Sequence, residues 1–373
     1  MRRAFLTVPR DRFVPEKVAA AGLESAYLDE AIPTKFGEGG MPMSSSSQPA
    51  IMAEMLERLA LEPGLRVLEI GAGTGYNAAL LTEIVGPRGR VDTVDIDGDT
   101  ARRARRALHE GGYPAKVSVA DGRNGYPARA PYDRIVVTAS AGTVPRAWFD
   151  QLVDGGIVEV PLRLREAAGA HVVASLEKHA DGFRSRSLVG GGFMPLRDAG
   201  DAGLPPSMRA IVVSDLTGER PRPLQQLSGV ALAGLSDAAK RRLVATSLEP
   251  ARKRPFGTRA DAGTLISYLS LTLPASRAVT TVPVWGVGVI ARDGRSLAYV
   301  VGGPHTPTLS AVQAHGDARA EDELLAAVAR WTAAGRPTLA DLSISVRYDG
   351  DAPIVSWRYA SRTDRRSTAG ARA

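Results

Sequence analysis

Residues 69–76 read EIGAGTGY, and three glycines alternate within this stretch: Gly71, Gly73 and Gly75. The preceding run, RVLEI, is typical of a buried strand, and the following residues have the apolar spacing of a helix. Glycine allows a tight turn between the two and lets a ligand approach the backbone closely. The dinucleotide-binding fingerprint has its third glycine one position later, where this chain has Tyr76. The glycine spacing alone therefore predicts a ligand-binding loop without identifying the ligand.

Two acidic residues further along the chain narrow the choice of ligand. Asp95 ends the next predicted strand, twenty residues after Gly75, and Asp121 with Gly122 follows the third strand. A carboxylate at Asp95 can accept hydrogen bonds from both hydroxyls of a ribose. Because ligands bind outside the carboxyl ends of the strands in open α/β sheets, the loop and the acids together predict a site for an adenosine-containing ligand.

The first half of the chain alternates apolar runs with helix-like segments. Buried strands are predicted at residues 66–70, 90–96, 116–120, 133–140 and 155–162. Helices are predicted at residues 49–61, 76–85, 99–110 and 144–153. This alternation is typical of parallel pairing with helices on both faces of one sheet. We therefore expect an α/β, Rossmann-like fold with a mostly parallel, doubly wound sheet.

The pattern changes after residue 162. Antiparallel strands are predicted at 171–179 and 183–189, and the Asp293-Gly294 turn predicts a hairpin. A helix at 321–334, stopped by Gly335, and a second hairpin turning at 349–351 follow. Proline, glycine and charge interrupt 249–263, which we expect to be irregular.

This change of pattern suggests how the chain is divided. We expect a ligand-binding domain over 1–190, a smaller α+β module over 191–360 and a disordered polar tail over 361–373.

The composition excludes several classes of site. The 373 residues carry a net charge of +7 and contain no cysteine, which excludes disulfides and thiolate chemistry and suits a cytoplasmic protein. The five histidines show no metal-ligand spacing, so no metal is expected. No apolar run approaches the roughly 18 residues of a membrane span, and the start of the chain lacks the apolar stretch of a signal peptide. A basic surface favours acidic partners.

Several motifs carry a resemblance to a known family. VLEIGAGTGYNAALL is similar to the first motif of class I S-adenosylmethionine-dependent methyltransferases. FVPE (13–16), SSSSQPAIMAEML (44–56), ADGRNGYPARAPYDRIVVTASAGTVP (120–145) and QLVDGGIVEVPL (151–162) resemble, in order and spacing, the protein-L-isoaspartate O-methyltransferase family. The resemblance covers about residues 5–165 and is specific only through the motifs taken together.

The resemblance implies S-adenosylmethionine as cofactor and a set of residues that bind it. Asp95 would hold the ribose, and Asp121 with Gly122 would lie beside the adenine. The full set of expected cofactor-binding residues is Glu69, Gly71, Gly73, Gly75, Asp95, Ile96, Asp121 and Gly122.

The resemblance also gives the serine run 44–47 a function. The family carries Thr-x-Ser followed closely by proline, next to the transferred methyl group; Ser47 falls on that serine and Ser45 on that threonine. We expect both to be catalytic, with the Ser47 hydroxyl orienting an acceptor carboxylate. Two other interpretations remain open: Ser47 only caps the helix that starts at Pro49, or the serines form a flexible polar loop.

Two carboxyl-methylation functions follow from the resemblance. Actinobacterial members with a C-terminal extension methylate an aspartate in ribosomally made peptides, and the ester then closes to an aspartimide. Compact members repair isoaspartyl residues in damaged proteins. Because about 200 residues follow the family motifs and include GGFMPLR (191–197), we expect peptide tailoring, with residues from about 190 onward recognising an acidic precursor peptide. Repair, with a protein or peptide substrate bearing isoaspartate, is the alternative.

A nucleic-acid methyltransferase is the weakest hypothesis. Base methylation usually accompanies an Asn/Asp-Pro-Pro-aromatic motif after the fourth strand, where this chain has VVTASAGTVP. Aromatic residues make up only 5% of the chain, and no basic stretch interleaved with aromatics is present to stack bases. We therefore expect no nucleic-acid partner; the oligomeric state stays open.

Overall fold

The computed structural model describes residues 1–37, 42–167, 169–197, 210–215, 222–282, 286–301 and 308–360. The chain divides into two compact units. The first consists of Met1–Leu162, Val172–Asp201 and Ile344–Ser356. The second consists of Arg163–His171, Ala202–Ser343 and Trp357–Ala373.

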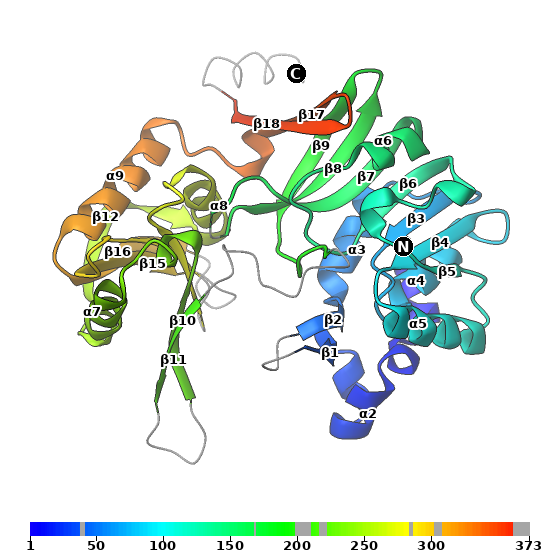
Figure 1. Ribbon diagram of the computed structural model, residues 1–373, viewed down its shortest axis with the longest axis horizontal. Coiled ribbons are helices and arrows are strands. Elements are labelled where there is room, and N and C mark those ends of the chain that lie inside the picture. Colours follow the sequence, from blue (N-terminus) through cyan, green and yellow to red (C-terminus); the bar gives the residue numbers. More distant parts are fainter. Residues whose placement is uncertain are drawn as a thin grey trace. The chain divides into compact units, whose positions relative to one another are not determined.

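A nine-stranded sheet organises the first unit, in the order β18-β17-β9-β8-β7-β6-β3-β4-β5 (Figure 1). Its strands are β3 (Arg66–Ile70), β4 (Arg90–Asp95), β5 (Lys116–Val119), β6 (Tyr132–Val137), β7 (Leu152–Arg163), β8 (His171–His179), β9 (Gly182–Gly190), β17 (Leu342–Asp349) and β18 (Ala352–Tyr359). Strands β3 to β7 pair in parallel, whereas β9 pairs antiparallel with both β8 and β17. The predicted α/β, Rossmann-like fold is confirmed, and antiparallel strands extend its sheet on one side.

Helices cover this sheet because their apolar residues recur at helical spacing. In α5, Ala101, Ala104 and Leu108 are buried, while Arg102, Arg103, Arg105 and Arg106 face solvent. Helices α3, α4 and α5 share one core with the strands. The helices of the first unit are α1 (Arg2–Thr7), η1 (Arg10–Phe13), α2 (Pro15–Ala21), η2 (Leu23–Ala26), α3 (Pro49–Arg58), α4 (Tyr76–Val85), α5 (Gly98–Gly111), η4 (Gly122–Asn124), η5 (Pro127–Arg129) and α6 (Arg146–Gln151). A small antiparallel sheet joins β1 (Ile32–Phe36) to β2 (Pro42–Ser46).

The second unit contains a seven-stranded sheet, in the order β10-β11-β13-β14-β15-β16-β12. Its strands are β10 (Ala210–Asp215), β11 (Arg222–Ser228), β12 (Arg252–Asp261), β13 (Ala278–Val282), β14 (Gly286–Ile290), β15 (Ser296–Val301) and β16 (Thr308–Gly316). Its helices are η7 (Val230–Leu232), α7 (Asp237–Leu248), α8 (Ala262–Thr272), α9 (Arg319–Ala333) and η8 (Leu339–Asp341). Neighbouring strands pair antiparallel throughout the described registers.

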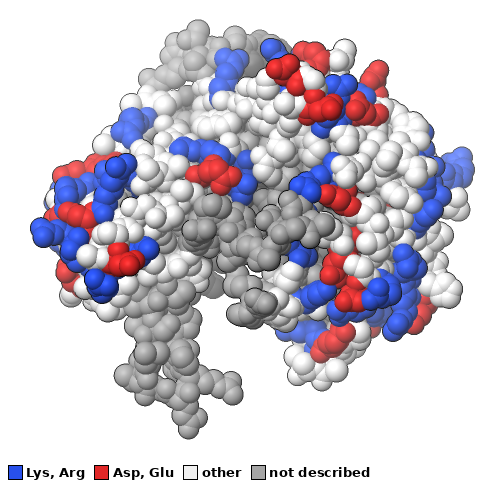
Figure 2. Space-filling view, in the orientation of Figure 1, with Lys and Arg blue, Asp and Glu red and all other residues white. Residues whose placement is uncertain are grey.

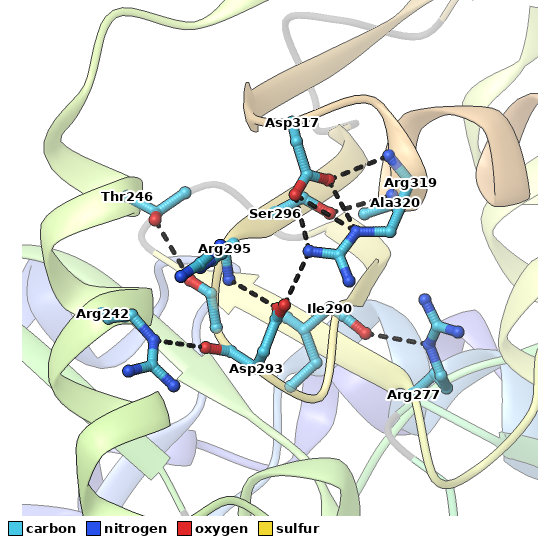
Figure 3. A network of polar contacts seen from close by, with 11 residues as sticks. Arg242, Thr246, Arg277, Ile290, Asp293, Arg295, Ser296, Asp317, Arg319 and Ala320 are labelled. Atoms are coloured by element: carbon cyan, nitrogen blue, oxygen red, sulfur yellow. Dashed lines mark hydrogen bonds and ion pairs between the residues drawn. The ribbon is translucent and has the colours of Figure 1, made fainter.

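Alternation along β15 places helices on both faces of this second sheet. Ala298 and Val300 pack with α8 and α9, whereas Leu297 and Tyr299 pack with α7. The predicted hairpin at Asp293-Gly294 joins β14 to β15. Figure 3 shows how this turn is held: the Arg319 guanidinium donates to the carboxylates of Asp293 at 2.7 Å and Asp317 at 2.6 Å.

Two expectations about the second half differ from the structure. Residues 249–263 were expected to be irregular, yet they contain the strand β12, which pairs with β16 across a register shift between Pro255 and Ala260. It is an edge strand, where proline and glycine are tolerated because one side of the backbone needs no sheet partner. The prediction of an irregular segment is therefore wrong.

The second difference concerns the division of the chain. A boundary at residue 190 assigns the hairpin 342–359 to the C-terminal module, whereas Ile344–Ser356 belong to the first unit because β17 pairs with β9. The predicted tail, 361–373, lies outside the described residues.

The β9–β17 pairing depends on a residue without a side chain. Gly182 has φ +141°, and a Cβ there would overlap the carbonyl oxygen of Val346. We expect Gly182→Ala to lower the free energy of unfolding by about 1–3 kcal/mol through backbone strain and overlap. Urea unfolding of the full chain measures this. Gly98→Ala is the matched control, because its Cβ would meet only the end of Arg102 at 3.6 Å; equal stability of the two variants would contradict the pairing.

Candidate functional site

A pocket of about 290 Å³ lies in the first unit, outside the carboxyl ends of β3, β4 and β6. Its walls come from the ends of those strands, the glycine loop, the serine strand β2, the start of α3 and the segment 192–197. This is the position at which open α/β sheets bind ligands, and the volume is near the lower end of the usual range for small-molecule sites.

The glycine loop adopts backbone conformations that only glycine accommodates readily. Gly71, Gly73 and Gly75 have φ values of +101°, +52° and +89°. A Cβ on Gly73 would lie 3.2 Å from the carbonyl oxygen of Ser45, and one on Gly71 would overlap Thr138. Gly71 and Gly73 line the pocket. Gly75 is not among the lining residues and directly precedes α4. A Cβ at Gly75 would meet Leu108 of α5, so the absence of a side chain allows the start of α4 to pack against α5.

Asp95 lines the pocket and also braces the glycine loop. Its Oδ2 accepts a hydrogen bond from the Gly73 amide at 3.1 Å, and its Oδ1 accepts one from the Asp97 amide at 3.0 Å. Burial raises the pKa of the Asp95 carboxyl. Ile96 lines the pocket beside it. A carboxylate held in this way has lone pairs left for ribose hydroxyls.

Glu69 is a second carboxyl at the pocket and is fully buried. Its Oε2 accepts from the Thr93 hydroxyl at 2.5 Å, and its Oε1 accepts from the Asn77 amide at 2.8 Å. Burial nevertheless dominates and raises the pKa of Glu69 to about 7. Near neutral pH the group is therefore divided between its neutral and charged forms, and a cationic ligand would favour the charged one.

Of the two residues predicted to lie beside the adenine, only Gly122 lines the pocket. Gly122 lines the pocket, and its carbonyl oxygen accepts a hydrogen bond from the Trp148 indole at 2.8 Å. Asp121 is not among the lining residues. Its carboxylate accepts from the Arg123 guanidinium at 2.6 Å and from the Arg123 amide at 2.9 Å, and this pairing lowers the pKa of Asp121.

Ser44, Ser45 and Ser46 lie in strand β2, Ser47 follows the end of that strand, and all four serines line the pocket. Of the two alternatives to a catalytic Ser47, the helix cap is wrong: Gln48 occupies the N-cap position of α3, and Asp29 accepts the Ala50 amide at 2.8 Å. The loop alternative is contradicted for Ser44, Ser45 and Ser46, which pair with β1, whereas Ser47 lies between β2 and α3.

One serine was not singled out by the sequence patterns. The Ser46 hydroxyl is buried and has no hydrogen-bond partner among the described atoms. A buried hydroxyl without a partner is unusual, and at a pocket wall it is available to a bound ligand.

The segment 192–197 is a wall of the pocket that sequence reasoning missed. It is held by Ser140 at the end of β6, whose amide donates to Met194 at 2.7 Å and whose carbonyl accepts from Leu196 at 2.8 Å. Arg197 lines the pocket, donates to the Met43 carbonyl at 3.4 Å, and its charge acts to lower the pKa of Asp95. The sequence signal was present as GGFMPLR, but it was interpreted as part of an extension.

These residues suit S-adenosylmethionine better than a metal ion. The pocket offers a backbone cradle at Gly71 and Gly73, carboxylates at Glu69 and Asp95 for cationic and hydroxyl groups, and an unpartnered hydroxyl at Ser46. Over the described ranges, no cluster of three His, Asp or Glu side chains could hold a metal ion. Within the same ranges, no helix is long and apolar enough to cross a bilayer.

Comparison with known proteins finds similarity to protein-L-isoaspartate O-methyltransferases. The sequence model of the family "Protein-L-isoaspartate(D-aspartate) O-methyltransferase (PCMT)" matches residues 1–200. A protein-L-isoaspartate O-methyltransferase of Ignicoccus hospitalis is 40% identical over 194 residues, which is 52% of this chain and 86% of the relative. The corresponding protein of Methanothermobacter thermautotrophicus is 41% identical over 197 residues, again 52% and 86% of the two chains.

A solved structure extends the likeness in fold to almost the whole chain. It is named protein-L-isoaspartate O-methyltransferase and aligns with a TM-score of 0.50 at 24% sequence identity. The alignment covers 95% of this chain and 93% of that one.

Glu69 gives a pH prediction for cofactor binding. Its pKa of about 7 in the free protein should fall when cationic S-adenosylmethionine binds, so binding releases protons below pH 7. Affinity should therefore rise as the pH is raised to about 7 and then level off, with a slope of at most about tenfold per unit. Calorimetric titration in buffers of different ionisation enthalpy measures the released protons. In Glu69→Gln the slope should vanish, and its persistence there would assign the proton to another group.

Proposed function

The chain belongs to the protein-L-isoaspartate(D-aspartate) O-methyltransferase family, and we propose that its acceptor is the free α-carboxylate of an isoaspartyl residue in a protein or peptide. Membership makes the chain an S-adenosylmethionine-dependent protein carboxyl methyltransferase. When bound, that cofactor supplies a methyl group activated by a sulfonium cation. The identity of the acceptor is the proposed part.

The observation that carries the proposal is the position of the serine strand against the cofactor loop. The Ser45 carbonyl oxygen is 3.2 Å from the Cβ position of Gly73, so β2 and the loop form adjoining walls of one pocket. No hydrogen bond from the Ser45 or Ser47 hydroxyl occurs among the described contacts, and Ser47 does not cap α3. Both hydroxyls are thus available to donate to a carboxylate.

A carboxylate acceptor needs little from the protein beyond placement. It is ionised at neutral pH, since its reference pKa is about 3.9 or below, so no general base is required. The chain's residues have to hold the acceptor oxygen in line with the methyl group and exclude water. The apolar residues Ile51, Met52 and Met55 of α3 and Phe193 line the pocket and suit a site in which opposite charges are consumed.

The comparisons favour repair over the peptide tailoring expected from the sequence. That expectation rested on the length of the chain and on GGFMPLR. The fold of the second unit also occurs in a solved structure that is named an isoaspartate methyltransferase, so length does not distinguish the two functions. GGFMPLR lies inside the family match to residues 1–200 and lines the cofactor pocket. It is therefore part of the methyltransferase unit rather than a mark of an extension.

The face drawn in Figure 2 gives no additional support for an acidic precursor peptide. On the face drawn in Figure 2, the Lys and Arg side chains of the described residues lie among Asp and Glu side chains. The described basic side chains therefore form no single basic patch on that face.

The test compares three acceptors with the full-length protein. We expect an isoaspartyl peptide to gain one methyl group and then to lose methanol as a succinimide closes. Mass spectrometry measures both changes. The peptide of identical sequence with ordinary aspartate should remain unmodified. An acidic ribosomal precursor peptide encoded near the gene is the third acceptor. Rapid methylation of that precursor, with the isoaspartyl peptide untouched, would establish tailoring instead.

Ser47→Ala tests the assigned hydroxyl. Losing the hydrogen bond that orients the acceptor should lower kcat on the order of tenfold to a hundredfold, because misplacement by about 1 Å costs that much. The dissociation constant of S-adenosylmethionine should change less than about twofold, since Gly71, Gly73 and Asp95, which are expected to hold the cofactor, are unchanged. Steady-state kinetics and calorimetry supply the two values. Ser187→Ala, on the exposed side of β9, is the matched control, and a kcat for Ser47→Ala equal to that control would remove Ser47 from catalysis.

A further inference from the structure

Arg10 is the most deeply buried arginine among the described residues, with 1% of its surface exposed. It lies in η1, and its guanidinium donates hydrogen bonds to four backbone carbonyl oxygens. The acceptors are Ala26 at 2.9 Å, Leu28 at 3.0 Å, Glu30 at 3.0 Å and Ser47 at 2.9 Å. One side chain therefore connects the segment 26–30 to the serine on which the family resemblance places the acceptor.

The charge of Arg10 is not neutralised by a contacting acid. The ion pairs among the described residues do not include Arg10, and its guanidinium lies 5.9 Å from the ring centre of Tyr76, which lines the pocket. Burial lowers the pKa of Arg10, while the charges of Tyr76 and Asp29 act in the opposite direction. Carbonyl oxygens accept from both terminal nitrogens, the Nε has no partner among the described atoms, and the positive charge stays in place. That sign favours an anionic group nearby.

The segment 26–30 also contacts the start of α3, just after Ser47, through Asp29. Its Oδ1 accepts the Ala50 amide at 2.8 Å, at the start of α3, and its Oδ2 accepts from the Gln48 side chain at 2.8 Å. Arg10 and Asp29 thus hold the chain at the Ser47 carbonyl and at Gln48 and Ala50 on its C-terminal side. These contacts restrain the Ser47 backbone beside the pocket.

We propose that Arg10 is a positioning residue for methyl transfer: by fixing the Ser47 carbonyl, it sets the direction in which the Ser47 hydroxyl meets the acceptor carboxylate. Arg10 acts through Ser47 and does not line the pocket. The geometry of the guanidinium is essential, because four acceptors at two nitrogens match a planar fork and not the single ammonium of lysine. The inference rests on the proposed acceptor site at Ser47.

Arg10→Lys and Arg10→Gln test it in the full-length protein with an isoaspartyl peptide. Both should lower kcat on the order of tenfold or more, because the acceptor is misplaced. Lysine should not rescue the rate although it keeps the charge. The dissociation constant of S-adenosylmethionine should stay within about twofold, which a general loss of structure would not allow.

Arg134→Lys is the matched control. Arg134 is a half-buried arginine of the same unit that donates to the backbone carbonyls of Leu59 at 2.7 Å and Ala60 at 3.2 Å, away from the pocket lining. Its kcat should remain near that of the wild type. A kcat of the Arg10 variants within twofold of this control, or a loss confined to cofactor affinity, would overturn the proposal.

Hydrogen exchange provides a readout that does not depend on the acceptor. In Arg10→Lys, amide exchange followed by mass spectrometry should accelerate in peptides spanning residues 42–52 and not in those from α4. If the wild type fails to methylate isoaspartyl peptides, the proposed acceptor is wrong. The exchange experiment still decides whether Arg10 positions Ser47: unchanged exchange at residues 42–52 refutes this, and faster exchange supports it. Should neither Arg10 variant fold, Asp29→Ala, which alters an exposed carboxylate, takes its place. If kcat and the exchange at residues 42–52 were both unaltered in Asp29→Ala, the positioning of Ser47 by the contacts of segment 26–30 would be refuted.

Discussion

The position of Gly73 between the β2 backbone and the Asp95 carboxylate is the constraint on which the rest of the site depends. The Gly73 amide donates to Asp95 at the end of β4, and the Cβ position of Gly73 is 3.2 Å from the carbonyl oxygen of Ser45 in β2. A side chain at Gly73 would push the glycine loop away from β2. Because the sheet fixes Asp95 and the β1–β2 pair fixes Ser45, the loop has one position between them. The glycine loop is thereby held by its close approach to the β2 backbone and by the Asp95 carboxylate.

Sequence reasoning succeeded where the signal is local. The strands β3 to β7 were predicted because buried parallel strands are continuous apolar runs, and α4 was predicted at its observed bounds because its glycine turn precedes an apolar helix. The pocket-lining positions of Gly71, Gly73 and Asp95 follow from the same motifs, since a strand-loop-helix unit determines where its loop lies. Their roles toward the cofactor remain predictions.

It failed where the determining contact is distant in the chain. That Asp29, and not Ser47, satisfies the start of α3 depends on a contact 21 residues away. The strand β12 was missed because its proline and glycine are signs of a loop unless the strand is known to lie at a sheet edge. Ser46 was passed over because its burial arises from β1, a partner that no periodicity in the serine run reveals.

The C-terminal hairpin has a consequence for biosynthesis. Residues 344–356 belong to the first unit, yet they are made after almost the whole second unit. Until β17 leaves the ribosome, β9 presents an unpaired backbone edge of the kind that recruits other strands. The second unit is thus synthesised while the first still lacks β17, and the β9 edge is exposed during that interval. A shortened gene product ending before β17 would carry the exposed edge permanently.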